Sequence, residues 1–224
     1  MTLQDQLDAI TARTRSLVQP ERLAVSEQAA AELFSTGIED RILPVGSRAP
    51  EFALEDSSST NQRPRLVRAL DLLTLGPLVI KFFRGRWDPY CVTELELWRD
   101  LYPELRSRGA LFVAISPQTC RQNAFMVEQH RLPFPVLCDP GSLLALQFRI
   151  SYVVPEVTRR YYRSILLNIP FANSGLTYET APESVWRLPL PGLFLVDEAG
   201  ILRFSQAFAD PRVRPEPADL LALL

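Results

Sequence analysis

Two helices are predicted at the start of the chain. Four apolar residues there keep a helical spacing: Leu3, Leu7, Ile10 and Leu17. Pro20 suits the first turn of a second helix, and Gly37 is placed to end it. We therefore expect residues 1–43 to form a helical extension that packs on the main domain or at a subunit contact. Residues 44–224 would then form the main domain.

From Pro44 onward, apolar runs alternate with amphipathic stretches. The runs at 78–83 and 110–115 are almost continuously apolar, as in strands that are buried on both faces. The other predicted elements are short strands at 51–54 and 134–137, a polar turn at 57–62, helices at 89–109 and 122–130, and a late hairpin of 193–196 with 201–204. This order predicts an α/β sandwich with a central mixed β-sheet.

The stretch 151–187 interrupts this alternation and is rich in proline and tyrosine. A helix is expected to start at Pro155, and its buried face is predicted from the apolar spacing as Val157, Tyr161, Ile165 and Leu166. The rest is expected to be an ordered excursion. Two roles are open for it: a wall of a pocket or a contact with a second subunit.

Composition excludes several classes of function. With 24 basic and 26 acidic residues the net charge is −2, so no basic field attracts nucleic acid or a membrane surface. Three cysteines are too few for a disulfide framework, and the sequence opens without a secretion signal, so we expect a cytoplasmic protein. One histidine argues against a histidine-based metal centre, and we expect neither a metal nor a cofactor. Lys81 is the single lysine, which we interpret as compositional bias.

The candidate chemistry lies at a strand-to-helix turn. Asp88 followed by Pro89 is a strong helix-start signal, which places Cys91 in the first turn of the helix. The positive end of the helix dipole favours a thiolate there, and Arg84 and Arg86 add positive charge before the turn. This layout is typical of a nucleophilic cysteine, although a lone cysteine is more often an inert apolar residue.

The stretch FFRGRWDPYCVTELELW resembles the active-site segment of the peroxiredoxin-like branch of the alkyl hydroperoxide reductase/thiol-specific antioxidant (AhpC/TSA) superfamily. Members of that branch usually read F-Y-R-G-x-W-C-P-Y-C-x-x-E-L at this point. Further matches extend the resemblance from about Val45 to the end of the chain: VGSRAPEFALED, VAISPQT, LPFPVLCDPG, LPLPGLFLVDEAGILRF and RPEPADLLALL. The resemblance implies a thioredoxin-like fold.

The resemblance places Cys91 at the peroxidatic cysteine, which attacks a peroxide and becomes a sulfenic acid. Asp88 departs from the pattern, because the branch has a cysteine there and ordinary peroxiredoxins have a threonine. As a helix cap Asp88 is favourable, but a carboxylate beside Cys91 raises the pKa of the thiol. Pro191 stands where peroxiredoxins usually have an arginine, so Arg84 or Arg86 would supply the cation.

The leading hypothesis is a thiol peroxidase that reduces hydrogen peroxide or alkyl hydroperoxides. Four residues would shape the substrate pocket: Trp87, Pro89, Tyr90 and Pro191. Cys120, Cys138 or an external thiol such as thioredoxin or glutathione would resolve the sulfenic acid, and a one-cysteine cycle with an external reductant is preferred. A homodimer is a further expectation.

Two alternatives are kept. The first is a degenerate member of the family that binds a partner or a small ligand because Asp88 has silenced the cysteine. The second is a disulfide oxidoreductase, which is weaker because such enzymes attack with the first cysteine of C-x-x-C, the one replaced here.

Overall fold

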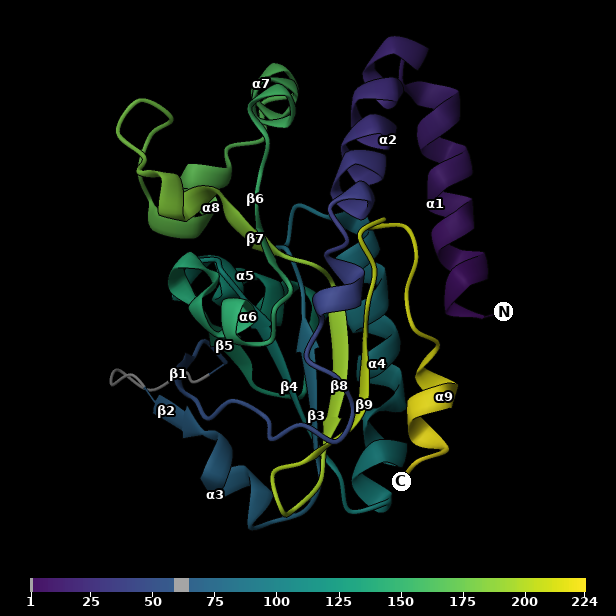
Figure 1. Ribbon diagram of the computed structural model, residues 1–224, viewed down its shortest axis with the longest axis vertical. Helices are drawn as coiled ribbons and strands as arrows, with labels where there is room; N and C mark the ends of the chain where they lie inside the picture. Colours follow the sequence, from purple (N-terminus) through teal and green to yellow (C-terminus); the bar gives the residue numbers. More distant parts are fainter. Residues whose placement is uncertain (1, 59–64) are drawn as a thin grey trace.

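The computed structural model describes residues 2–58 and 65–224, so part of the predicted polar turn at 57–62 lies outside the described residues. A seven-stranded mixed sheet forms the centre, in the order β2-β1-β5-β4-β3-β8-β9, which confirms the predicted sheet (Figure 1). Its strands are β1 (Ala53–Asp56), β2 (Arg65–Arg68), β3 (Leu78–Phe82), β4 (Leu111–Ser116), β5 (Val136–Cys138), β8 (Gly192–Val196) and β9 (Leu202–Ala207).

The centre of the sheet positions the turn that carries Cys91. Strands β3, β4 and β5 run parallel, β8 pairs antiparallel with β3, and β9 pairs antiparallel with β8. The carboxyl ends of parallel strands meet at one edge of a sheet, where loops commonly build a site. Helix α4 (Pro89–Ser107) starts at this edge, directly after β3 and a short connection.

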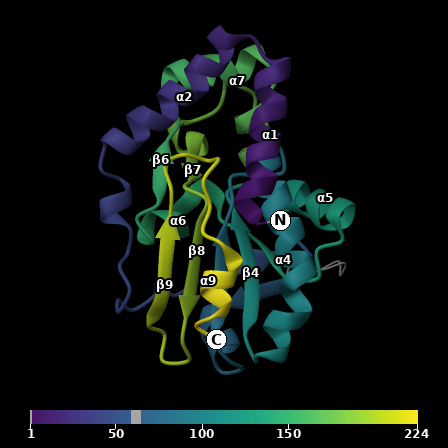
Figure 2. The same ribbon diagram turned by 90° about the vertical axis from the view of Figure 1, so that its right-hand side faces the viewer.

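Helices cover both faces of the sheet (Figure 2). One face packs against α4, α5 (Cys120–His130) and α9 (Pro217–Leu221), and the other against α3 (Ala69–Leu73) and α6 (Leu143–Gln147). Side chains alternate along a strand, so Ile80 points to the α6 side while Val79 points to the α4 side. Lys81 shares the α4 side with Val79 and is completely buried there.

The predicted helices of the extension are present as α1 (Leu3–Leu17) and α2 (Pro20–Ser35). Helix α1 packs beside α4, and the Thr11 and Tyr90 hydroxyls lie 3.1 Å apart. Helix α2 is different, because none of its residues, all of which are described, is fully buried. It reaches the same end of the molecule as the helix α7 (Glu156–Ser164), beyond the edge of the main sheet (Figure 1).

The stretch 151–187 forms its own small layer. It contains β6 (Ser151–Val153) and β7 (Arg187–Pro189), which pair antiparallel, and the helices α7 and α8 (Ile169–Ser174). Three short 3₁₀ turns complete the described elements of the chain: Glu39–Arg41, Pro140–Ser142 and Glu183–Trp186. None of the described helices is both long enough and apolar enough to cross a membrane.

The predicted buried face of α7 is wrong. Val157 is 57% exposed and Leu166 is 92% exposed, whereas Thr158 is buried. The helix ends at Ser164, and Leu166 adopts a left-handed backbone with φ of 59°, so the assumed helical period stops before it. The helix instead turns Thr158 and Tyr162 inward, toward a hollow beside α2.

Candidate active site

The turn before α4 is built as the sequence predicts. Asp88 caps the helix, and its Oδ1 accepts a hydrogen bond of 3.0 Å from the backbone N–H of Tyr90. Pro89 is the first helical residue, so Cys91 is the third and lies in the first turn. The helix dipole therefore acts on the Cys91 sulfur.

Cys91 is nevertheless held as a thiol. Its Sγ is completely buried and donates a hydrogen bond of 2.9 Å to Asp88 Oδ2. The pKa of Cys91 is raised to about 12, first by burial and then by the negative charge of Asp88, against the opposing charges of Arg214 and Arg84. Burial and one carboxylate thus outweigh the helix dipole, whose contribution is only about 0.3–1 kcal/mol at exposed sites.

Arg84 joins this pair through Asp88. Its Nε and Nη2 lie 2.8 and 2.7 Å from Asp88 Oδ2, the oxygen that also accepts from Cys91. Burial alone would raise the pKa of Asp88, but the charges of Arg84 and Arg214 outweigh it and hold that pKa below its usual value. Asp88 is therefore an ionised carboxylate. Arg84 contacts Asp88 rather than Cys91, and its charge lowers the pKa of Cys91 from that position.

Arg86 does not support Cys91. Its side chain is exposed, its Nε donates to Gln122 at 3.0 Å, and it lies over the ring of Phe125. Gly85 separates the two arginines with φ of 156°, a region that L-residues rarely adopt. The chain turns there, so Arg84 points inward and Arg86 outward. The expectation that either arginine could serve is corrected to Arg84.

Arg214 is the nearby cation that the sequence analysis missed. Its Nη2 lies 3.7 Å from the Cys91 sulfur, and its Nε lies 2.7 Å from Glu94 Oε2. The second oxygen of Glu94 lies 2.5 Å from Lys81 Nζ. One signal pointed here: Glu94 follows Cys91 by three residues and so shares its helix face. Arg214 carries no such local signal, being 123 residues away.

Lys81 has a structural role after all, contrary to its interpretation as compositional bias. It belongs to a buried charged cluster that we define as Lys81, Arg84, Asp88, Glu94 and Arg214. The cluster holds three basic groups and two carboxylates around a neutral thiol, and a Cys91 thiolate would be its third anion. Burial lowers the pKa of Lys81, which makes it the basic group most ready to lose its proton.

Two hollows adjoin the cluster without reaching the sulfur. The smaller, of about 200 Å³, is lined by Trp87, Asp88, Pro89 and Tyr90 together with α1 and α2 residues. The larger, of about 450 Å³, lies between α2 and the β6–α7 layer. Arg84 lines both, whereas Pro191 is buried and lines neither of these two hollows among the described residues. Asp88, which lines the smaller hollow, is the lining residue that contacts the Cys91 sulfur directly.

The other two cysteines are joined by a disulfide, Cys120–Cys138, with Cα atoms 5.6 Å apart. Three cysteines are too few for a disulfide framework, but this one bridge forms because α5 begins beside the end of β5. Of the three cysteines, all described, Cys91 is the free one. Strand β5 lies two strands from β3, so the bridge is separate from the Cys91 turn.

Metal ligands do not gather in the part of the chain that the structure describes. Among residues 2–58 and 65–224, no group of three His, Cys, Asp or Glu side chains could hold an ion.

A family model described as AhpC/TSA family matches residues 45–205. The chain belongs to the AhpC/TSA family. The resemblance drawn from the Cys91 segment is thereby confirmed, and so is the thioredoxin-like fold that it implied.

Relatives and solved structures agree with this assignment. A Mycobacterium tuberculosis protein assigned by name to the peroxiredoxins is 31% identical over 109 residues, which cover 49% of this chain and 68% of that protein. The crystal structure of peroxidoxin BcpB from Mycobacterium tuberculosis has a TM-score of 0.56 at 23% identity and covers 81% of this chain and 95% of its own. A yeast mitochondrial 1-Cys peroxiredoxin has a TM-score of 0.58 at 15% identity, and the match covers 81% of this chain and 75% of that one.

Proposed function

We propose that this protein is a thiol peroxidase that reduces hydrogen peroxide or alkyl hydroperoxides at Cys91. The observation that supports this most directly is the free thiol in the first turn of α4, 3.7 Å from the Arg214 guanidinium. A cation at this distance stabilises negative charge on sulfur and on the oxygens of an attacked peroxide. Membership of the AhpC/TSA family and the named relatives support the same activity.

In the proposed reaction the Cys91 sulfur attacks one peroxide oxygen and the O–O bond breaks. The sulfur gains an OH group as sulfenic acid, and the other oxygen leaves as water or an alcohol after taking up the thiol proton. Asp88 accepts the thiol hydrogen bond in the resting state, so it is placed to receive that proton and to pass it to the leaving oxygen. Arg84 and Arg214 would hold the charge that develops.

We further propose a one-cysteine cycle with an external thiol such as thioredoxin or glutathione. The reductant attacks the sulfenic acid, releasing water and leaving a mixed disulfide, which a second thiol then cleaves. The pairing of Cys120 with Cys138 supports this proposal, because neither sulfur is a free thiol. Internal resolution by either cysteine would first require that bridge to open.

A second candidate function follows from the same geometry. The Cys91 thiol is sealed and bonded to a carboxylate, and its pKa is raised to about 12. Such a cysteine fits a family member that has lost its chemistry and binds a partner or ligand instead. The two candidates differ in whether peroxide converts Cys91 to sulfenic acid.

The deciding experiment measures sulfenic acid formation at Cys91 by mass spectrometry under hydrogen peroxide. It compares the wild-type protein with Cys91→Ser, Asp88→Thr and Asp88→Cys. Oxidation of the wild type faster than that of a free cysteine peptide, and its loss in Cys91→Ser, is the result expected of a peroxidase.

Two other results would count against wild-type peroxidase activity. Slow oxidation in the wild type with fast oxidation in Asp88→Thr means that the carboxylate has silenced the site. Slow oxidation in every variant means that the fold no longer activates this cysteine at all.

A further inference from the structure

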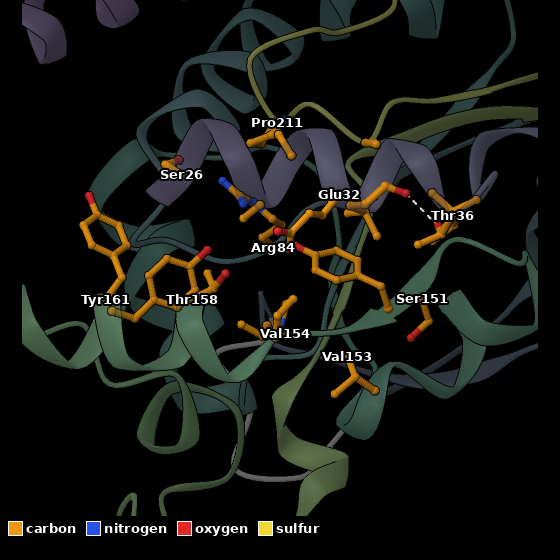
Figure 3. A pocket seen from close by; sticks show the side chains of 18 of the residues that line it. Ser26, Glu32, Thr36, Arg84, Ser151, Val153, Val154, Thr158, Tyr161 and Pro211 are labelled. Carbon is orange, nitrogen blue, oxygen red and sulfur yellow. Dashed lines mark hydrogen bonds between the residues drawn. The ribbon is translucent and has the colours of Figure 1, made fainter. Parts of the chain in front are cut away.

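The hollow of about 450 Å³ between α2 and the β6–α7 layer has the size of a small-molecule site. Its walls are mostly apolar or aromatic, and Figure 3 shows side chains from both layers turned into it. The apolar and aromatic lining residues include Leu33, Val153, Val154, Tyr161 and Pro211.

Helix α2 supplies one wall and packs unusually lightly. Ala29, Ala30 and Leu33 face the hollow and are only half-buried, and none of the sixteen described residues of α2 is fully buried. An apolar helix face over an open hollow leaves apolar surface in water, which is unfavourable. An apolar ligand in the hollow would remove that helix face from water, as packing against a hydrophobic core does.

The inner end of the hollow carries a buried charge. Arg84 lines it with a side chain only 9% exposed, and the Asp88 contacts use Nε and Nη2 of its guanidinium. A guanidinium has five N–H donors in a planar fork that matches a carboxylate. Tyr152 and Tyr162 line the same hollow as Arg84. Burial raises the pKa of each phenol, and the charge of Arg84 opposes that rise.

The remaining charged groups of the hollow lie at its mouth. Glu32 and Arg41 are exposed there, and both have hydrogen-bond partners: Gln28 donates to Glu32, and Arg41 donates to the backbone oxygens of Thr36 and Gly37, directly after α2. At the inner end Arg84 is itself paired with Asp88, but the buried charged cluster behind it holds three basic groups and two carboxylates. An incoming anion therefore meets an excess of buried positive charge there.

We propose that this hollow binds an amphipathic monocarboxylate, with its apolar body against α2 and its carboxylate on Arg84. Such a ligand carries no peroxide and is distinct from the substrate of the proposed reaction. Its negative charge would offset that of Arg84, which lowers the pKa of Cys91 in the empty protein. Occupancy therefore makes Cys91 less reactive, so the site regulates the thiol across Asp88.

Binding is tested with octanoate and octan-1-ol by calorimetry on Cys91→Ser protein, in which no thiol chemistry occurs at this position. We expect octanoate to bind roughly tenfold tighter than the alcohol, the ratio that one charge-assisted contact supplies. Ala30→Trp fills the hollow and should abolish binding. Ala24→Trp is the matched control, because Ala24 is exposed on the same helix and does not line the hollow.

Equal affinity for acid and alcohol, or octanoate binding that survives Ala30→Trp, would overturn the proposal. The regulatory part is tested on wild-type protein, by the rate at which iodoacetamide alkylates Cys91. That rate should fall as octanoate saturates the site and stay constant with Ala30→Trp. An unchanged wild-type rate at saturation overturns the coupling. Neither test depends on peroxidase activity. Failure of the ligand proposal can therefore be distinguished from failure of the proposed peroxidase function.

Discussion

At the scale of single residues, Asp88 decides the state of Cys91. One of its oxygens caps α4, and the other accepts from both Arg84 and the thiol. A capping residue placed three positions before a cysteine therefore also acts as its hydrogen-bond acceptor. The helix-start signal and the raised pKa are two consequences of the same side chain.

Asp88→Thr should lower the pKa of Cys91. Threonine keeps a capping oxygen but removes the negative charge, so Arg84 and Arg214 act on the sulfur unopposed. In the wild type, alkylation by iodoacetamide should keep rising up to about pH 11, because the thiol titrates near 12. The variant should level off at a lower pH, and superimposable profiles would show that Asp88 does not set this pKa.

The same shift has a consequence for stability. A free thiol has a pKa of about 8.5, so above that pH the unfolded chain loses a proton that the folded protein keeps. Cys91 therefore favours folding below about pH 8.5, and this contribution is lost as the pH rises toward 12. Urea unfolding of wild type against Cys91→Ser should show a gap that changes above pH 8.5, and a constant gap contradicts the shift.

Glu94 should be the costliest member of the buried charged cluster to remove. It contacts both Lys81 and Arg214, and Glu94→Leu leaves two buried cations without this counter-charge. Breaking a buried pair typically costs about 3–5 kcal/mol of unfolding free energy. Lys81→Met is the matched control, because Glu94 keeps Arg214, and urea unfolding should show the smaller loss there. Equal losses would mean that Glu94 and Lys81 act only as a pair.

At the scale of elements, the connection from β3 to α4 separates the roles of the two arginines. Gly85 lies between them with φ of 156°, and a Cβ there would lie 2.5 Å from Gln118 Oε1. That oxygen accepts from the Arg86 backbone N–H at 2.9 Å, which ties the connection to the start of α5. The local backbone, more than either side chain, sends Arg84 inward.

Gly85→Ala should destabilise the protein and disturb the cysteine site. Strained backbone alone costs about 1–3 kcal/mol, and the clash with Gln118 adds to it. Gly109→Ala separates the two effects, since Gly109 has φ of 82° but no atom within 4 Å of its added Cβ. Thermal unfolding should show the larger loss for Gly85→Ala, and only that variant should change the alkylation rate of Cys91. Equal losses of stability and equal changes in alkylation rate in the two variants would mean that backbone strain, and not the clash with Gln118, causes them.

At the scale of the whole molecule, two separate sulfur centres share one sheet. Cys91 lies in the core in the first turn of α4, and the Cys120–Cys138 bridge ties α5 to β5. The N-terminal helices and the 151–187 layer close over the edge that carries Arg84, which gives the molecule its hollows. The wall role expected as one option for that layer is the one that the described contacts support.

Replacing both bridged cysteines by serine should cost stability but leave the reaction at Cys91 intact. A bridge between residues 18 apart contributes about 3 kcal/mol in the loop-entropy account. Sulfenic acid should still form at Cys91 under peroxide, as a one-cysteine cycle requires. A peroxide-induced disulfide between Cys91 and Cys120 or Cys138 in the wild type would contradict external resolution.

The sequence by itself determined what depends on neighbouring residues. Asp88 and Pro89 specify the start of α4, and the apolar runs specify β3 and β4, because capping and hydrophobic periodicity act within a few residues. The Cys91 segment also determined the family. Prediction failed at Leu166, where a left-handed residue ends the period, and missed β6 and β7, whose three-residue strands are too short for a pattern.

Only the tertiary structure decided which groups meet Cys91. Arg214 arrives from 123 residues away, Lys81 lies in an apolar strand, and Cys120 meets Cys138 only once α5 packs on β5. The thiol pKa depends on such tertiary contacts, since burial and charge within a few ångströms set it. A local sequence pattern encodes neither distance nor burial, so it identified the cysteine and left its reactivity to the fold.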